Sequence, residues 1–250
     1  MIGADDIIVP DWPAPRGVKA LFTTRLGGVS QGVFASLNLG AHVGDDSAAV
    51  VENRRRLGAL LPAKPIWLNQ VHGIAVHAIS GDAADSDSAP VADAAMTLQR
   101  NRCCAILVAD CLPILFCDTG GTCVAATHAG WRGLAAGVIE RTIEAMPVAP
   151  QYLVAWLGPA IGAGAFEVGR DVVEAFTKHE PASRRAFQPI AGSDGKYLAD
   201  IFELARQRLA KAGVEQIFGG GDCTFSTPVR FFSHRRDGRS GRMAAIVWRE

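Results

Sequence analysis

Three uncharged apolar runs follow one another in the middle of the chain and constrain its fold more than any other feature. They cover residues 103–109, 112–117 and 122–127, and Gly120 and Gly121 lie between the last two. Runs of this length and composition are typical of strands that are buried on both faces. The glycine pair predicts a turn between neighbouring strands. We therefore expect a mixed α/β fold in which strands cluster in runs rather than alternate strictly with helices.

Helical patterns lie on both sides of these runs. A helix is predicted over residues 45–61, with Asp45, Asp46 and Ser47 as N-cap candidates and Pro62 at its end. Apolar residues near helical spacing predict a single amphipathic helix over 130–146, which Pro147 closes. Two further helices are expected over 170–178 and 197–212.

The remaining segments favour strands and loops. The strands expected outside the central runs cover 18–24, 152–157, 214–218, 229–232 and 243–248, with one or two more within 65–80. The acidic segment 81–93 is small and polar and indicates an exposed loop. No repeat or linker divides the chain, so we expect one domain over residues 1–250.

The charge balance restricts the partners of the protein. Twenty-five basic residues stand against twenty-five acidic ones, and 49% of the residues are hydrophobic. A net charge of zero argues against nucleic acid or an anionic membrane as a partner held by bulk charge. The N-terminus does not resemble a secretory signal, and prolines and glycines interrupt the uncharged stretch 145–166. We expect a cytoplasmic protein that binds a small molecule.

Three short segments carry side chains suited to chemistry. They cover residues 69–73, 109–113 and 127–133, and they supply His72, Cys111 and His128 at predicted strand ends. Such junctions hold side chains rigidly while leaving them open to a cleft. The spacing of the three residues matches no short metal-binding motif, so their meeting is a hypothesis at this point.

Several chemistries are open to this group of side chains. Two imidazoles and one thiolate leave a fourth position open on a tetrahedral zinc ion, as in catalytic sites, and the same ligands suit a trigonal copper site. Without metal, Cys111 and His128 would form a nucleophile and base pair. Asp110 is either a partner behind the ligands or the cap of a turn.

Basic residues near these segments suggest places for an anion. The predicted helix that begins near Gly130 would point free N–H groups at the same cleft, with Arg132 beside them. The alternative is an ordinary helix start with Arg132 in solvent. Five arginines also lie within residues 230–242, where either anion binding or a solvated turn would explain them.

Together the motifs closely resemble the YfiH/YlmD family, also called laccase-domain or multicopper polyphenol oxidoreductase proteins. The segments that carry the resemblance are TTRLGGVSQGVFASLNLGAHVGDD, ENRRRL, NQVHG, ADAAMT, ADCLPILF, HAGWRG, GPAIGAGAFEVG, DCT and FFSHRRDGRSGRM, in this order from about residue 18 to the end. The resemblance implies a single four-layer α/β/β/α domain with mixed sheets. One departure is Ala160, where many relatives have cysteine.

The resemblance also implies a site and an activity. It places a zinc ion on His72, Cys111 and His128, which would also be the catalytic residues. It implies a purine nucleoside phosphorylase acting on adenosine, inosine and methylthioadenosine, with adenosine deaminase activity. The substrates would be a nucleoside and phosphate, and the motifs suggest Arg25, Asn38, Gln70 and Arg132 as their contacts.

Two other functions stay open from the sequence. One is a copper-dependent polyphenol oxidoreductase, but the six histidines include no H-x-H pair, which laccases use to hold several copper ions. The other is a cysteine hydrolase or peptidoglycan editing factor that uses Cys111 and His128.

Overall fold

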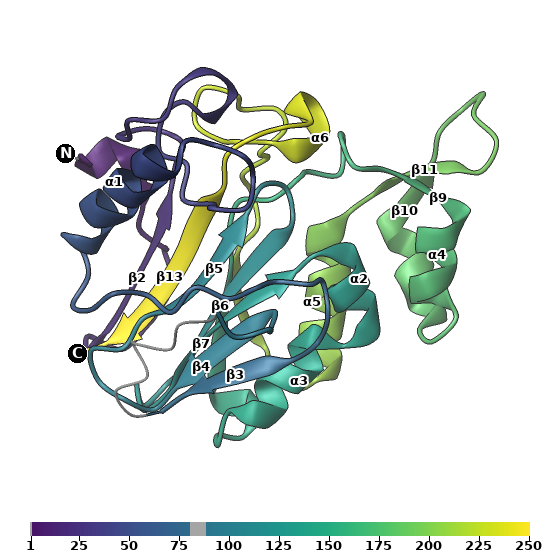
Figure 1. Ribbon diagram of the computed structural model, residues 1–250. Coiled ribbons are helices and arrows are strands. Elements are labelled where there is room, and N and C mark those ends of the chain that lie inside the picture. The colour runs from purple at the N-terminus through teal and green to yellow at the C-terminus, as the bar shows by residue number, and fades with distance from the viewer. Residues whose placement is uncertain (1, 81–88) are drawn as a thin grey trace.

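The chain folds around two main sheets that pack face to face. The computed structural model describes residues 2–80 and 89–250. The first sheet is antiparallel, and its strands are, in spatial order, β1 (Ile7–Ile8), β2 (Val18–Thr23), β13 (Met243–Arg249) and β5 (Cys104–Val108). The second sheet is mixed, and its order is β12 (Gln216–Gly219), β8 (Leu153–Leu157), β6 (Leu112–Asp118), β7 (Val124–Ala129), β4 (Ala94–Thr97) and β3 (Val76–Ile79). Figure 1 shows both sheets.

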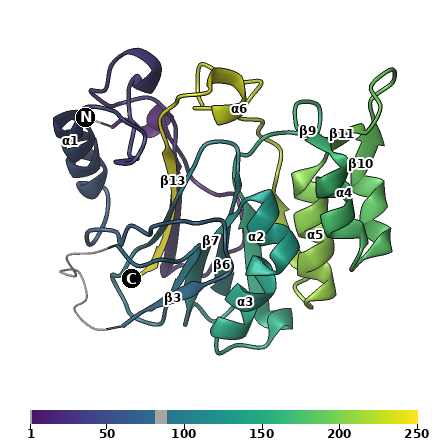
Figure 2. The same ribbon diagram turned by 45° about the vertical axis from the view of Figure 1, so that its right-hand side comes forward.

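Helices cover the outer faces of the two sheets and complete a four-layer α/β/β/α arrangement (Figure 2). Helix α1 (Ser47–Gly58) covers the four-stranded sheet. The six-stranded sheet is covered by α2 (Trp131–Ala136), α3 (Val138–Ala145) and α5 (Ile201–Lys211). A third, small sheet of β10 (Phe187–Pro189), β11 (Lys196–Ala199) and β9 (Glu167–Gly169) lies beside α4 (Arg170–Thr177). The short elements are α6 (His234–Asp237) and the 3-10 helices Ala4–Asp6, Gly32–Phe34, Pro150–Tyr152 and Pro181–Ala186. The predicted four-layer mixed α/β fold is confirmed.

Each pair of neighbouring layers encloses its own apolar core. Successive residues of a strand point to opposite faces, so β13 contributes to two cores. Met243, Ala245 and Val247 pack between the two sheets, whereas Ala244, Ile246 and Trp248 face α1. Strand β6 divides its side chains in the same way between the inter-sheet core and the helices. This double burial explains why the central runs are apolar without alternation.

The helix expected over residues 130–146 is two helices, which corrects the sequence prediction. Gly137 has φ of 106° and separates α2 from α3. This left-handed conformation suits glycine and ends one helix while the apolar spacing continues into the next.

Two further predicted elements differ from the structure. Residues 197–212 hold the end of β11 and then α5, which Asp200 caps by accepting from the Glu203 N–H at 3.0 Å. Residues 229–232 are not a strand, because the Phe231 N–H closes a turn onto the Thr227 carbonyl at 3.0 Å.

The prediction of an exposed loop over residues 81–93 is wrong at its C-terminal end. Residues 81–88 of that prediction lie outside the described residues. Ala92 and Asp93, however, are buried, with Asp93 fully inaccessible to solvent. Within the part of the chain that is described, none of the helices has the length and apolar character needed to cross a bilayer.

Candidate functional site

The register of the six-stranded sheet brings four chain segments to one edge. Strands β6 and β7 pair so that Pro113 lies opposite His128. Strand β4 begins opposite the end of β7, and β3 begins opposite the start of β4. The residues just before β3, β4 and β6 therefore meet the last residues of β7. This edge collects the side chains of His72, Asp93, Cys111 and His128.

The three residues predicted as ligands converge at this edge. The ligand atoms of His72, Cys111 and His128 all lie within 4.8 Å of one another. The Cys111 Sγ lies 3.9 Å from His72 Nε2, and the two imidazole rings meet edge to face with centroids 4.9 Å apart. The structure thus shows that the three sequence motifs form one cluster.

Gly130 keeps the space in front of this cluster open. A Cβ atom at this position would lie 2.9 Å from His72 Cδ2 and 3.1 Å from Cys111 Sγ. Such contacts are too short, so any larger residue would push the two ligands away. Gly130 also precedes α2, which places the start of that helix beside the cluster.

Asp93 organises the cluster from behind, and the sequence reasoning missed this role. Its Oδ1 lies 2.8 Å from His128 Nδ1 and accepts from the His72 N–H at 2.9 Å. Its Oδ2 accepts from the N–H groups of Val71 at 3.2 Å and Gly73 at 2.7 Å. One carboxylate therefore orients the His128 ring and fixes the loop that carries His72. The available signal was an aspartate directly before an apolar strand.

The electrostatics of the cluster favour a thiolate beside a protonated imidazole. Burial raises the pKa of the Cys111 thiol, but the charge of His128 and the hydrogen bonds from His128 and His72 outweigh it and bring the pKa to about 6. Burial lowers the pKa of His128, but the Cys111 thiolate and Asp93 outweigh it and raise the pKa to about 9. The thiolate is the form in which cysteine binds metal or attacks a substrate.

The donor set fits a metal ion with an open coordination position. The hydrogen bond between His128 Nδ1 and Asp93 leaves Nε2 of that ring free to face the cluster, as in many metal sites with a carboxylate behind the histidine. Two imidazole nitrogens and a thiolate suit zinc or copper, and neither would need a further protein ligand. Among the described residues, this is the one group of three or more His, Cys, Asp or Glu side chains with such geometry.

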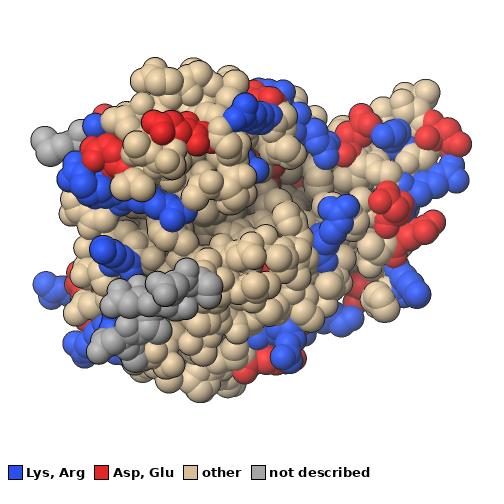
Figure 3. Space-filling model, viewed as in Figure 1, with Lys and Arg blue, Asp and Glu red and all other residues tan. Residues whose placement is uncertain are grey.

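Two cavities meet at the cluster. The larger one, of about 840 Å³, and a smaller one, of about 190 Å³, share His72, Ala109, Cys111, Arg132 and His234 as lining residues. The face in Figure 3 is hollowed between its upper and lower parts, with basic side chains at the border of the hollow. These five residues line both cavities, and we call them the shared wall.

Two of the four predicted substrate contacts line the larger cavity. Gln70 lies in its wall, but its amide is hydrogen-bonded to the Leu107 backbone through both its nitrogen, at 2.9 Å, and its oxygen, at 2.7 Å. Arg132 is exposed in the shared wall, and its guanidinium carbon lies 4.4 Å from the centroid of the Trp131 ring.

The structure does not bring Arg25 and Asn38 into the cavity linings. Arg25 donates to the carbonyls of Ala35 and Pro228, at 2.8 and 2.9 Å. Asn38 is fully buried, and its Oδ1 accepts from the backbone N–H groups of Gly40 and Arg242, both at 2.9 Å. Both side chains therefore tie backbone segments together.

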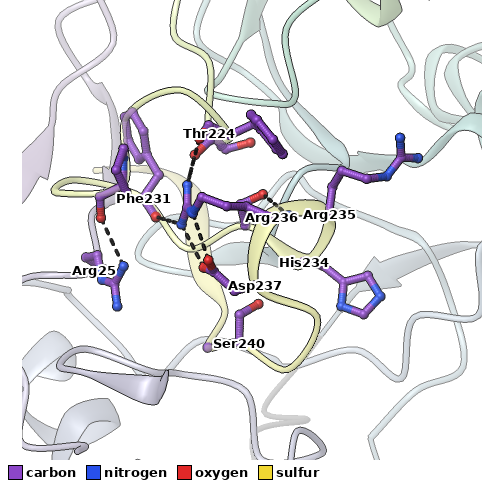
Figure 4. Close-up of polar contacts among 12 residues, drawn as sticks. Arg25, Thr224, Phe231, His234, Arg235, Arg236, Asp237 and Ser240 are labelled. Atoms are coloured by element: carbon purple, nitrogen blue, oxygen red, sulfur yellow. Dashed lines mark hydrogen bonds and ion pairs between the residues drawn. The ribbon is translucent and has the colours of Figure 1, made fainter. Parts of the chain in front are cut away.

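The arginine-rich segment 230–242 is held by an internal network (Figure 4). Arg236 donates to the carbonyls of Thr224, Phe225 and Phe231 at 2.8 to 3.0 Å and pairs with Asp237. His234 and Arg235 point away from this network (Figure 4), and His234 lines both cavities. Most of this arginine cluster is therefore structural.

Asp110 supports the same segment rather than a cluster ligand. It accepts from the hydroxyls of Thr224 at 2.6 Å and Ser233 at 3.0 Å, and from the Arg235 N–H at 2.7 Å. Its backbone has φ of 86°, a conformation that non-glycine residues rarely adopt. The neighbouring Cys111 is therefore carried on a turn that the 224–235 segment holds in place.

The fold and the cluster define a mixed α/β protein with an open His-Cys-His metal-type site at the edge of its central sheet. The chain belongs to the family described as multi-copper polyphenol oxidoreductase laccase, whose sequence profile matches residues 19–250.

Characterised relatives and solved structures agree with this assignment. The chain is 54% identical over 241 residues to purine nucleoside phosphorylase PA4543 of Pseudomonas aeruginosa, which covers 96% of this chain and 97% of that protein. It is 53% identical over 244 residues to purine nucleoside phosphorylase YfiH of Escherichia coli, with coverage of 97% and 98%. The crystal structure of NMB0706 from Neisseria meningitidis superposes with a TM-score of 0.93 at 49% identity, covering 98% of this chain and 99% of that one. YlmD from Geobacillus stearothermophilus gives a TM-score of 0.83 at 35% identity, covering 95% and 94%. The predicted resemblance to the YfiH/YlmD family is confirmed.

Proposed function

We propose that this protein is a purine nucleoside phosphorylase. The observation that carries the proposal is its similarity, over nearly the whole chain, to two proteins of that name at 54% and 53% identity. In this reaction an oxygen of hydrogen phosphate forms a bond to C1′ of the sugar while the C1′–N9 bond breaks. The purine leaves with the bonding electron pair and takes the proton of the phosphate, so ribose 1-phosphate and a neutral base are formed.

His72, Cys111 and His128 would hold the metal, and we propose zinc, because two imidazoles and one thiolate leave the open position of catalytic zinc sites. When bound there, zinc supplies a Lewis acid that polarises an oxygen of the substrate or of water. Asp93 keeps the His128 Nδ1 protonated and therefore directs Nε2 toward the metal. Gly130 leaves the approach to the three ligands clear.

The smaller cavity suits the purine. The residues that line only this cavity include Trp131, Ile161, Phe166 and Ile201. Their side chains offer flat and apolar contact to a heteroaromatic ring. Arg235 lies over the Phe166 ring, with its guanidinium carbon 5.4 Å from the ring centroid. A base held here would place its sugar at the shared wall, next to the three candidate ligands.

The test combines metal analysis with product analysis. We expect purified protein to contain about one zinc per chain, and to release hypoxanthine from inosine only when phosphate is present, with ribose 1-phosphate as the second product. Cys111→Ala should lose both the metal and the activity. Base release that does not depend on phosphate, or no base release from zinc-loaded protein, would refute the proposal.

The same assay addresses the further activities that the family resemblance implies. Adenosine supplied without phosphate would yield inosine and ammonia if the site also deaminates, because that reaction needs an activated water and no phosphate. A copper ion in the same three ligands would instead have to support phenol oxidation. The described residues offer one group of ligands, whereas laccases hold several copper ions, so we place oxidation behind phosphorolysis.

The lowered pKa of Cys111 favours a second candidate, a metal-free hydrolase. A thiolate with a pKa of about 6 beside two imidazoles matches an activated cysteine nucleophile. In that case chelation would leave activity intact, and a peptide from a cell-wall precursor would be cleaved through a covalent adduct on Cys111. Loss of activity on chelation, restored by zinc, would rule out this candidate.

A further inference from the structure

The larger cavity carries a strong local positive charge in a chain that is neutral overall. Its described lining residues include Arg54, Arg132 and Arg242 together with His42, His72 and His234, and none of them is Asp or Glu. Some arginines elsewhere in the fold pair with a carboxylate, such as Arg208 with Glu140 at 2.8 Å and Arg185 with Glu203 at 2.7 Å. Among its described lining residues, the cavity thus gathers three arginines with no carboxylate, and Cys111 is the one lining side chain that can carry a negative charge.

Arg54 and Arg242 are the two least explained of these cations. Both are partly buried, and neither forms an ion pair within the described part of the chain. Arg54 donates through Nε to the Leu39 carbonyl at 2.9 Å, and Arg242 donates through Nη1 to the Ser240 and Gly241 carbonyls at 2.8 and 3.1 Å. The remaining nitrogens of both guanidinium groups form no hydrogen bond with described residues. Burial lowers the pKa of both side chains; the charges of Cys111 and Asp110 oppose this effect at Arg242, whereas no anionic group of the protein does so at Arg54. Partly buried arginines usually have an anionic partner, and Arg54 therefore needs one more than Arg242 does.

One short segment fixes the two arginines relative to each other. Leu39 accepts from Arg54 through its carbonyl, while its N–H donates to the Arg242 carbonyl at 3.1 Å. Burial, and then the charges of Arg242 and Arg54, lower the pKa of His42, so both guanidinium groups lie close to this ring. The fold thus maintains two neighbouring cations against their mutual repulsion, at a cost that a bound anion would offset.

The arrangement of the two cavities at the cluster matches the geometry of a displacement at C1′ of the sugar. The two cavities adjoin at the shared wall, which contains His72 and Cys111. A phosphate that attacks C1′ must approach the sugar from the side opposite the departing base. If the purine occupies the smaller cavity, the phosphate belongs in the larger one.

We propose that Arg54 and Arg242 form the phosphate seat, binding the dianion through their unengaged guanidinium nitrogens while the purine lies beyond the shared wall. This inference rests on the proposed phosphorolysis and adds the orientation of both substrates. The phosphate oxygen that faces the sugar forms the new bond to C1′, and the electron pair of the C1′–N9 bond moves away from the seat with the base. The ribose 1-phosphate product remains held by the same two arginines.

Arg132, which the sequence suggests as the anion contact, is less suited to this role. It is exposed, whereas Arg54 and Arg242 are partly buried; stacking does not distinguish the candidates, because Arg54 lies over the Trp67 ring as Arg132 lies over the Trp131 ring. It lines both cavities, whereas Arg54 and Arg242 line the larger cavity alone. Helix α2, in whose first turn it lies, has only six residues and offers little dipole to support an anion.

The test compares Arg54→Gln and Arg242→Gln with Arg55→Gln as the matched control. Arg55 lies on the same helix but is exposed and paired with Glu52 at 2.7 Å. Inosine cleavage gives separate KM values for phosphate and nucleoside, and titration calorimetry with inorganic phosphate and with ribose 1-phosphate gives Kd values without turnover. We expect each of the first two variants to raise the KM and Kd of phosphate about tenfold or more, with the KM of inosine changed less than about twofold.

The controls separate this inference from the proposed function. If the wild type shows no phosphorolysis, the proposed function fails, while the phosphate titration still decides whether the two arginines bind the anion. Arg242→Lys keeps the charge and is expected to lose less affinity than Arg242→Gln, which provides a second measurement if Arg54→Gln unfolds. Phosphate affinity equal to that of Arg55→Gln in both variants, or a loss confined to Arg132→Gln, would overturn the inference.

Discussion

Replacing Asp93 by asparagine would test whether a single carboxylate organises the candidate metal site. The Asp93 carboxylate faces four donors, two at each oxygen: the His72 N–H and the His128 ring at Oδ1, and the Val71 and Gly73 N–H groups at Oδ2. An asparagine amide has nearly the same shape, but one of its two ends is itself a donor. In either orientation of the amide, its NH₂ group therefore faces two donors.

The size of the effect follows from these contacts. A hydrogen bond to a charged group contributes about 1.5 kcal/mol or more, so losing two of them should lower the free energy of unfolding by about 3 kcal/mol. The amide can regain a partner only if the His128 Nδ1 becomes an acceptor, which moves the ring proton to Nε2 and removes a ligand atom. Partners of this kind behind a ligand typically change metal affinity by about 10- to 100-fold.

Asp118→Asn provides a matched control within the same sheet. Asp118 is also buried and also accepts four hydrogen bonds, from Gly120, Thr122 (backbone and hydroxyl) and Cys123. It ends β6, however, while Cys111 precedes that strand, which separates them by about 20 Å. Both variants should be less stable in urea unfolding, but only Asp93→Asn should weaken zinc binding in competition with a chelator. Equal zinc affinity in the two variants would refute the reasoning.

Three further predictions concern the thiol, the glycine before α2 and the arginine-rich segment. In metal-free protein, the rate of alkylation of Cys111 should increase with pH around a midpoint at a pKa of about 6 rather than the usual 9.0, because the imidazoles stabilise the thiolate. Peptide mass spectrometry at a series of pH values measures this rate, and a midpoint near 9 would contradict the prediction. Gly130→Ala should weaken zinc binding about tenfold or more, because its Cβ would crowd His72. Gly164→Ala is the control, because its Cβ would enter open space, and its zinc affinity in competition with a chelator should not change. Arg236→Gln should lower the free energy of unfolding by about 2 to 4 kcal/mol, because three carbonyl acceptors lose their donor; an unchanged urea midpoint would count against this.

The candidate ligands could be predicted from the sequence, whereas the group that holds them could not. His72, Cys111 and His128 each lie in a motif at a predicted strand end, and the family resemblance, rather than their spacing, implied that they meet. Asp93 follows a small, acidic and polar segment and was assigned to an exposed loop. Its burial depends on the pairing of β3, β4 and β7, which no local pattern reveals.

The place of Arg54 in the cavity wall could not be predicted from the pattern of charged residues either. Arg54 stands in a run of three arginines on α1, which resembles a solvated helix face. Only the packed structure separates it from its neighbours, because Arg55 and Arg56 pair with Glu52 whereas Arg54 lies in the cavity wall. Arg25 and Asn38 are a different case: their motifs suggest substrate contacts, a prediction that stays untested, while the structure shows both side chains bound to backbone groups.

Periodicity predicted the layers of the fold better than their interruptions. The apolar runs became the strands that separate the cores, because burial on both faces requires an apolar residue at every position. The same pattern continued across Gly137 and concealed the break between α2 and α3, which depends on a backbone conformation rather than on hydrophobicity. The buried phenylalanines 231 and 232 resembled a strand but fill the inter-sheet core from a turn.

The two histidines of the candidate metal site differ in burial, and this difference would set how fast a metal exchanges. His128 lies within a sheet strand at 3% exposure, whereas His72 is exposed on a loop that is held mainly through three amide hydrogen bonds to Asp93. Local opening of that loop needs far less free energy than unfolding of the sheet. A bound ion would therefore dissociate by losing His72 first, and its residence time would follow the opening of residues 71–73 rather than the global stability of the protein. Amide hydrogen exchange at Gly73 would then report the lifetime of the bound metal directly.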